Sequence, residues 1–338
     1  MDNITQGIIG GALFTLSTKK YTIKNFLLGG LIANIPDSDI FIAKLLYTDP
    51  LDQFFFHRGV MHSIIGGLGI GVITGIIVSL LKSGKLLWEK VLNIIWSCII
   101  TIFGGHLIID WLTTYGMRRF LPWSNRVSSG DIIFVVDFGM RVGLLILFVS
   151  YIISRSRKFI SLSILGFVCI YLCACGLFKY TSYQHITRAF GLHYDSASIK
   201  RVIIVPEPLQ PFLRRGVIQT SGGIYQTWYS VFDNVEPTNF IYAPGESIAS
   251  YDLSTIPHLN QVYDFSRGFL LKQTNSGNIV FNNYLFGYYG GGMSGSQQTM
   301  FGFTLSGDAL IQVSSHRVLT TGVWTRFRKR VGGELLLK

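Results

Sequence analysis

Long apolar stretches dominate the first half of the chain. Residues 159–178 contain no charge, and a helix of this length can cross a hydrocarbon core about 30 Å thick. Five further apolar runs precede it, at residues 4–16, 26–46, 60–81, 91–112 and 132–153. This pattern predicts an α-helical polytopic membrane domain with about five to six helices.

The pattern changes near residue 180, where the chain becomes polar. β-branched and aromatic residues then alternate with turn residues in four segments, at residues 202–209, 216–232, 277–289 and 300–315. Such segments are typical of strands, and residues 288–298 read as a glycine-rich loop. We therefore expect a transmembrane helical domain at residues 1–179, followed by a β-rich extramembrane domain at residues 180–338.

Composition agrees with a membrane location. Only 14% of the 338 residues are charged, compared with about 25% in soluble domains. The net charge of +11 would suggest nucleic acid in a soluble protein. The sequence contains no glycine-rich nucleotide loop and no nucleic-acid motif, so we attribute the charge to membrane topology and lipid phosphates. The four cysteines lie inside apolar runs and are interpreted as packing residues.

Basic residues are concentrated in three alternate connections between the apolar runs. These residues are Lys19, Lys20 and Lys24, then Lys82, Lys85 and Lys90, and finally Arg155, Arg157 and Lys158. Positive residues usually remain in the cytoplasm, which places the β-rich domain outside it. Arg118, Arg119 and Arg126 fall on the predicted outer side and reduce the difference in positive charge between the two sides of the membrane. The start of the chain lacks the features of a cleaved signal peptide.

Acidic and imidazole side chains gather at the predicted outer ends of the apolar runs. The stretch IPDSD brings Asp37 and Asp39 into the second run, where Pro36 is expected to break the helix. The stretch HRGVMHS places His57 and His62 at the start of the third run. Ionisable groups at membrane depth are costly and usually functional. These four side chains are therefore candidates for one shared site.

Two later segments add further candidates. In GGHLIID, His106 and Asp110 are four residues apart on one helical face, a spacing that lets two side chains bind one ion. Asp137 begins the fifth run. Mixed imidazole and carboxylate ligands suit zinc, manganese or iron. We predict one or two divalent ions per chain, zinc before manganese or iron, with the ligands Asp37, Asp39, His57, His62, His106, Asp110 and Asp137.

Basic side chains offer an alternative explanation for the acidic ones. Arg58 and Arg141 could neutralise some of the aspartates without any metal. The arginines of the loop at residues 113–126 could hold a phosphate or carboxylate group. The same loop could instead anchor the protein at the membrane interface through its tryptophan and tyrosine side chains. The two roles of the loop are compatible.

The ordered motifs resemble the YdjM-like family of bacterial membrane-bound metal-dependent hydrolases. The matching segments are residues 36–39, 57–63, 104–110, 114–116 and 136–137, and the resemblance covers about residues 1–180. Two positions depart from the family pattern. Gln6 stands where a histidine commonly follows Thr5, and Met61 replaces the usual threonine before the second histidine. The resemblance implies a multi-pass protein of the bacterial cytoplasmic membrane.

The resemblance also implies hydrolysis, and we expect an ester or phosphoester of a lipid or lipid-linked substrate at the outer membrane face. Asp39 or Asp137 would accept a proton, unless Asp137 only orients a histidine. Arg58, Arg118 or Arg119 would stabilise the developing anion. The alternative is a non-catalytic membrane protein with a structural metal site and a partner-binding β domain. The hypothesis of an ion carrier ranks last. A carrier needs polar residues through the full depth of the bilayer, and the inner halves of the apolar runs lack them.

Overall fold

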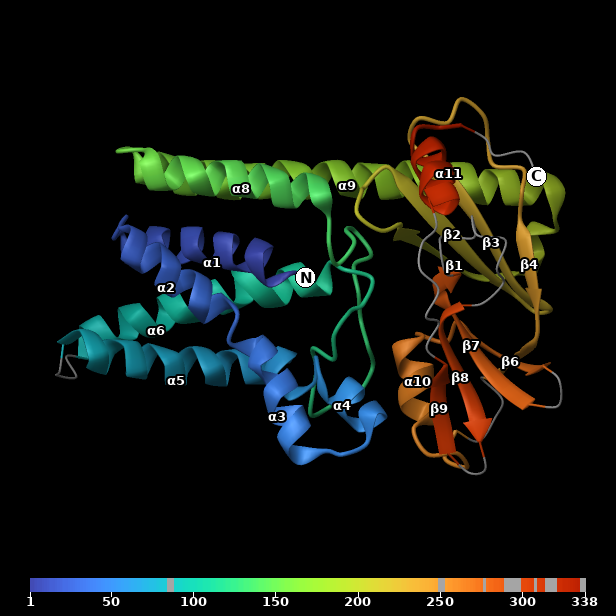
Figure 1. Ribbon diagram of the computed structural model, residues 1–338, viewed down its shortest axis with the longest axis horizontal. Helices are drawn as coiled ribbons and strands as arrows, with labels where there is room; N and C mark the ends of the chain where they lie inside the picture. Colours follow the sequence, from blue (N-terminus) through green and yellow to red (C-terminus); the bar gives the residue numbers. More distant parts are fainter. Residues whose placement is uncertain are drawn as a thin grey trace. The chain divides into compact units, whose positions relative to one another are not determined.

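The chain divides into two compact units, Met1–Ala174 and Cys175–Lys338. A computed structural model describes residues 1–83, 88–248, 253–275, 278–288, 299–306, 309–313 and 321–334 (Figure 1). The division falls inside the long helix α9 (Arg157–His193), so residues of this helix belong to both units. The first unit contains all the acidic and imidazole side chains that the sequence nominates as metal ligands.

The first unit is built from helices and short helical turns. Its elements are α1 (Asn3–Thr18), α2 (Ile23–Ala33), η1 (Pro36–Ser38), α3 (Asp39–Leu46), α4 (Pro50–Phe56), η2 (Val60–His62), α5 (Ile64–Ser83), α6 (Trp88–Ile102), η3 (Phe103–Leu107), α7 (Ile108–Trp111) and α8 (Phe138–Ile153). Large aliphatic side chains remain exposed along these helices, among them Ile73, Leu81 and Ile146. Such an apolar surface suits contact with lipid rather than water.

Fewer helices are long enough to cross a membrane than the sequence suggested. Among the described residues, three helical segments are candidate spans, at Ile64–Leu81, Glu89–Trp111 and Arg157–His193. The bent pair of α2 with Pro36–Leu46 would be a fourth if the two parts form one span. The expectation of five to six spanning helices was therefore wrong. Helices α1 and α8 have 16 residues each. At 1.5 Å per residue they extend about 24 Å, which is short of a core about 30 Å thick.

The expected break at Pro36 is confirmed. Helix α2 ends at Ala33, and the chain continues through the 3₁₀ turn η1 into α3 with a bend of 49°. Proline has no N–H for a helical hydrogen bond, and it stands at the start of the turn, where none is needed. The break turns the chain so that Asp37 and Asp39 lie at the junction of two short helical elements.

Glycines allow α1, α2 and η3 to approach one another closely. A Cβ atom on Gly29 of α2 would lie 2.4 Å from the Cβ atom of Phe14 and 2.8 Å from the carbonyl oxygen of Gly10. A Cβ atom on Gly105 of η3 would lie 2.8 Å from the Cα atom of Gly10. Small residues at helix contacts are a common means of packing in membranes, where lipid is as apolar as the protein. These contacts hold η3 against α1.

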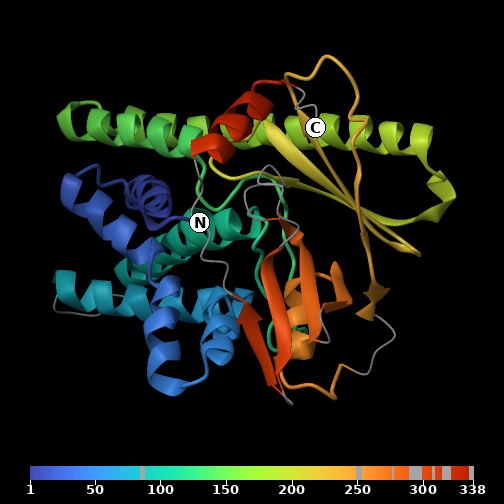
Figure 2. The same cartoon turned by 45° about the vertical axis from the view of Figure 1, so that its right-hand side comes forward.

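The second unit contains two antiparallel sheets (Figure 2). The first consists of β1 (Ile199–Pro206), β2 (Leu213–Thr220), β3 (Gly223–Ser230) and β4 (Ile241–Pro244), in that order. The second consists of β5 (Glu246–Ser247), β6 (Leu270–Asn275), β7 (Asn278–Tyr288), β8 (Thr299–Ser306) and β9 (Ala309–Val313), also in sequence order. Helices α10 (Leu259–Phe265) and α11 (Thr321–Val331) complete the unit. Each segment expected to form strands does so, whereas the glycine-rich loop lies almost entirely outside the described residues.

A buried arginine joins the two sheets. Arg215 of β2 donates from Nε to Glu207 Oε1 at 2.8 Å, and Trp228 Nε1 donates to the same oxygen at 3.0 Å. The Nη atoms of Arg215 donate to the carbonyl oxygens of Tyr284 and Leu285 in β7, each at 3.0 Å. Because its charge is paired and most of its donors are satisfied, the buried guanidinium can hold the sheets together.

We expect Gly29→Ala to destabilise the first unit by about 1–3 kcal/mol, because the new methyl group overlaps backbone atoms of α1. The measurement is thermal unfolding of the detergent-purified chain. Gly69→Ala in α5 is the matched control, since a Cβ atom there meets nothing within 4 Å. That variant should be neutral or slightly more stable, because alanine favours the helix. Equal behaviour of the two variants would contradict the close packing.

Candidate metal centre

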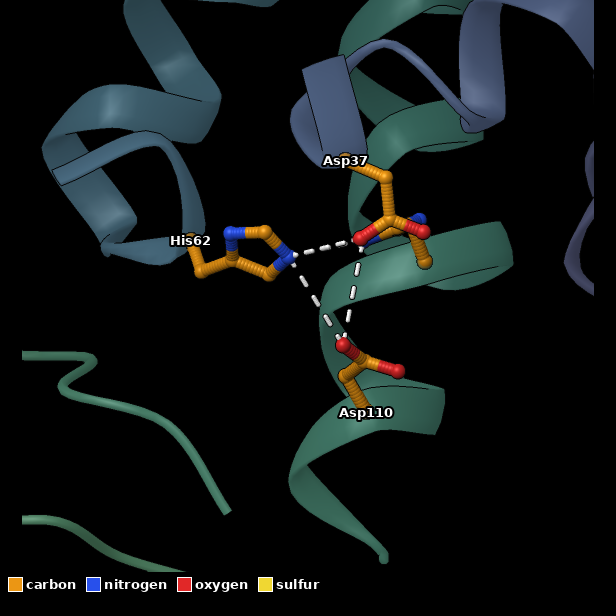
Figure 3. A group of neighbouring side chains, drawn as sticks. Asp37, His62 and Asp110 are labelled. Carbon is orange, nitrogen blue, oxygen red and sulfur yellow. Dashed lines mark hydrogen bonds and ion pairs between the residues drawn. The ribbon is translucent and has the colours of Figure 1, made fainter. Parts of the chain in front are cut away.

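Four donor atoms from separate parts of the first unit converge on one point. Asp37 comes from η1, His62 from η2, His106 from the π-helical turn η3, and Asp110 from α7. One ligand atom from each lies within 4.8 Å of the others. Figure 3 shows Asp37, His62 and Asp110 pointing toward one another. The expectation that the motifs share one site is met for these four residues.

The separations between the donor atoms suit one small divalent ion. His62 Nε2 lies 3.2 Å from Asp37 Oδ1, 3.1 Å from His106 Nε2 and 3.7 Å from Asp110 Oδ2. His106 Nε2 lies 3.5 Å from Asp37 Oδ1 and 3.8 Å from Asp110 Oδ2. Zinc bonds of about 2.1 Å in a tetrahedron place neighbouring ligand atoms about 3.4 Å apart. The five separations, from 3.1 to 3.8 Å, bracket this spacing, so the four side chains lie close to the arrangement that such an ion needs.

A buried carboxylate oxygen without a hydrogen bond also points to a cation. Within the described part of the chain, Asp110 Oδ2 is buried and accepts no hydrogen bond, and Nη2 of Arg58 lies 3.3 Å from it as an ion-pair partner. Asp110 and His106 are both fully buried. A bound cation would supply a closer partner for this carboxylate oxygen.

The π-helical turn explains how His106 reaches the site. It interrupts the helix formed by α6 and α7 between Phe103 and Leu107. The extra residue of such a turn shifts the side chains that follow it, and π turns are frequent at functional sites. His106 and Asp110 still share a face, as the four-residue spacing predicted, but the turn itself has no clear sequence signal.

Asp39 and His57 form an adjacent group that shares His62. Asp39 Oδ1 lies 2.7 Å from His57 Nδ1, and Asp39 Oδ2 lies 3.1 Å from His62 Nδ1. The backbone N–H of Arg58 also donates to Asp39 Oδ2, at 3.1 Å. A carboxylate at Nδ1 fixes the imidazole tautomer that presents Nε2 as a ligand. Asp39 thus orients His62, and the group Asp39, His57 and His62 is also compact enough for a second ion.

Burial and carboxylates act in opposite directions on His62. Burial disfavours the charged imidazolium, but the hydrogen bonds with Asp37 and Asp39 outweigh it and raise the pKa of His62. A metal ion must displace the proton that His62 would otherwise hold. The affinity of the site for a divalent ion should therefore increase with pH.

Arg58 supports Asp110 from a strained backbone position. Its φ angle is +61°, in the left-handed region that side chains with a Cβ atom rarely adopt. Its Nη2 lies 3.3 Å from Asp110 Oδ2, and Nη1 donates to Thr113 Oγ1 and to the Gly116 carbonyl oxygen. The guanidinium also lies 4.4 Å from the ring centroid of Tyr115. Arg58 therefore neutralises an aspartate, the alternative role that the sequence left open.

The amino-terminal residues also hold Asp110, a contact that the sequence did not reveal. Gln6 Nε2 donates to Asp110 Oδ1 at 2.8 Å, and the amine of Met1 pairs with the same oxygen. Gln6 thus contributes a donor to a metal-site carboxylate at the position where the family pattern has a histidine. Its Nε2 supports a ligand, and its Oε1 is buried without a hydrogen-bond partner in the described part of the chain.

The remaining nominated residues lie in other environments. Asp137 caps α8, accepting hydrogen bonds from Met140 N at 3.0 Å and from the Tyr171 hydroxyl at 2.5 Å, and belongs to neither donor group. Arg118 donates to the Phe55 carbonyl oxygen. Arg119 lies over the rings of Trp111 and Phe120. A carboxylate is a preferred helix cap, and this accounts for an acid at position 137 without a metal.

Comparison with known proteins identifies the family of the first unit. A family model described as YdjM inner membrane protein matches residues 1–182. The matched region contains both donor groups. No curated protein and no solved structure matches the chain. The family match confirms the resemblance indicated by the motifs, and together with the apolar helices it supports a membrane location.

Removing one of the four converging donors should abolish tight metal binding. Loss of a residue that only supports a ligand lowers metal affinity by about 10–100-fold, and loss of the ligand itself should cost more. We therefore expect His106→Ala to lower the metal affinity by at least about a hundredfold. Asp137→Asn should retain the metal, because asparagine can still cap α8. The measurement is metal content of the two purified variants by elemental analysis. Loss of metal from Asp137→Asn, or retention by His106→Ala, would contradict the assignment.

Asp39→Asn tests whether Asp39 orients a ligand or is one. An amide at this position weakens the hold on His62 Nδ1, and we expect about a 10–100-fold weaker metal affinity with unchanged stoichiometry. The measurement is competition with a chromogenic chelator. A drop from two ions per chain to one would instead show that Asp39 binds a second metal.

Proposed function

We propose that the chain, which belongs to the YdjM inner membrane protein family, is a membrane-embedded, metal-dependent hydrolase. Its substrate would be an ester or phosphoester of a lipid or lipid-linked molecule. The proposal depends on one observation, the convergence of two imidazoles and two carboxylates at distances that suit a single divalent ion. Zinc fits this donor set first, with manganese and iron as alternatives.

The chemistry of hydrolysis divides between the ion and the protein. A divalent ion held by Asp37, His62, His106 and Asp110 supplies a Lewis acid, which polarises a carbonyl or phosphoryl oxygen and makes water more acidic. The protein must also accept the proton of the attacking water. His57 suits this role, because 22% of its side chain is exposed and its Nδ1 is held by the nearly inaccessible Asp39. Asp39 would then orient His57 and stabilise its charged form.

Arg119 is the best-placed of the three nominated arginines to meet an anionic group. The guanidinium of Arg58 pairs with Asp110, and Arg118 donates to the Phe55 carbonyl oxygen. The guanidinium of Arg119 contacts the rings of Trp111 and Phe120, and its buried Nε has no hydrogen-bond partner in the described part of the chain, which leaves a donor at its edge for a ligand. A phosphate or carboxylate of the substrate would pair with this edge.

The surroundings of the site support a lipid substrate. Helix α3 begins with Asp39 and exposes Phe41, Leu45 and Leu46, and 86% of the Leu45 side chain is accessible. An apolar surface beside the polar cluster would let acyl chains remain in lipid while the polar linkage reaches the ion. By the distribution of basic residues, we propose that the site faces the outside of the cytoplasmic membrane and that the β-rich unit lies on that side.

A structural metal site is the second candidate. It is favoured by the number of donors, because four protein ligands can close a tetrahedron and leave no position for substrate. The metal would then join η1, η2 and η3, and the β-rich unit would bind a partner. Cobalt substitution distinguishes the two roles. A visible spectrum that changes when phosphate is added indicates an open position, whereas an insensitive tetrahedral spectrum indicates a closed site.

Hydrolysis should be measured on the full chain in detergent, with phospholipids and lipid-linked phosphates as substrates. We expect activity to disappear after chelation and to return with zinc or manganese. His57→Ala should lower kcat by about 10²–10⁴-fold while the metal content stays constant. Asp137→Asn serves as the control and should keep its activity. Metal-loaded protein that cleaves none of these substrates and gives an insensitive cobalt spectrum would overturn the hydrolase proposal.

A further inference from the structure

A second polar cavity lies at the opposite end of the helices from the metal centre. It has a volume of about 530 Å³ and is lined by the end of α1, the end of α5 and the beginning of α6. Three lysines, Lys19, Lys20 and Lys90, line it together with several hydroxyl side chains. None of its lining residues is acidic. The cavity is thus lined by positively charged side chains, whereas negatively charged carboxylates converge at the metal centre.

The three lysines have no acidic partner in the described part of the chain. All three are exposed, and no carboxylate there lies within ion-pair distance of them. The neighbouring hydroxyls of Thr18 and Ser97 donate to carbonyl oxygens of their own helices, at 2.6 and 2.8 Å. Their lone pairs are left to accept from a ligand. The cavity therefore offers ammonium donors for an anion beside acceptors for a hydroxylated group.

The backbone at Lys19 adds an independent observation. Lys19 ends α1 with a φ angle of +54°, in the left-handed region. The N–H of Lys19 donates to the Leu16 carbonyl oxygen, and the N–H of Lys20 donates to the Thr15 carbonyl oxygen. In this pattern of hydrogen bonds at the end of a helix, glycine usually occupies the left-handed position. A lysine there is locally unfavourable. The presence of a lysine at this strained position beside the cavity is explained if its ammonium group binds a ligand.

The position of the cavity along α6 corresponds to a membrane surface. Lys90 lies at the beginning and His106 near the end of the candidate span Glu89–Trp111, whose 23 residues extend about 34 Å. That length is sufficient for a hydrocarbon core about 30 Å thick, so the cavity and the metal centre lie toward opposite ends of this span. The same lysines belong to connections that the charge bias assigns to the cytoplasmic side. Basic pockets between helix ends on that side commonly bind lipid headgroups.

We propose that this cavity binds the headgroup of an anionic glycerophospholipid, with Lys19, Lys20 and Lys90 around the phosphate. The headgroup hydroxyls would donate to Thr18 and Ser97. Phosphatidylglycerol carries both groups and is the probe of choice. The choline of phosphatidylcholine carries a positive charge that opposes the lysines, so this lipid should bind more weakly. The inference is independent of the hydrolase proposal, because no metal or reaction is involved.

The test is lipid retention by the full chain, purified in detergent and treated with chelator, measured by native mass spectrometry. Wild type should bind phosphatidylglycerol at least about tenfold more tightly than phosphatidylcholine. Lys19→Gln/Lys20→Gln/Lys90→Gln should lose at least about tenfold in phosphatidylglycerol affinity. Lys24→Gln/Lys44→Gln/Lys158→Gln is the matched control, because it removes the same charge from exposed lysines outside the cavity. The control should bind as wild type does.

Lys19→Gly separates binding from folding. Glycine suits the left-handed position, so this variant should unfold at the same or a higher temperature while its phosphatidylglycerol affinity falls. Equal losses in the triple variant and its control would overturn the proposal in favour of general charge attraction. Unchanged binding in Lys19→Gly and in the triple variant would also overturn it. Competition by inorganic phosphate at concentrations equal to those of the lipid would assign the cavity to free phosphate and overturn the lipid assignment.

Discussion

The compensation of buried carboxylates is the constraint on which the first unit depends. Asp110 has no solvent exposure, yet it lies at the end of an apolar helical segment. A carboxylate in such surroundings is tolerated only with close cationic or hydrogen-bonding partners. Arg58, Gln6, His62 and the amine of Met1 approach it from two other segments. Satisfying one side chain thus draws together the amino terminus, the turn before α5 and the end of α6.

Close packing of α1 against its neighbours makes this convergence possible. Gly10 lies against Gly29 of α2 and Gly105 of η3, and a methyl group at either of the latter two would overlap atoms of α1. The helices can therefore approach until short polar side chains reach one another. Because Asp37, His62 and Asp110 have limited reach, a wider spacing would leave charges apart in an apolar environment. Packing and site chemistry are consequently linked.

The two ends of the first unit carry different chemistry. At one end, carboxylates and imidazoles surround a position that suits a divalent cation. At the other, three lysines surround a cavity without acidic residues. Apolar helix surfaces lie between them. This polarity fits a protein that engages the two faces of a membrane through different groups, one set suited to a metal ion and the other to phosphate.

The sequence by itself determined the class of each half, because hydropathy and residue periodicity act locally. It also located the helix break at Pro36 and the shared helical face of His106 and Asp110, since both follow from local backbone geometry. Only the tertiary structure decided which acids meet: Asp37 is one of the four converging donors, Asp39 lies against His57 and His62, and Asp137 caps a helix. These carboxylates look equivalent in a linear sequence, and their roles separate only when helix bends, π turns and close packing fix their distances.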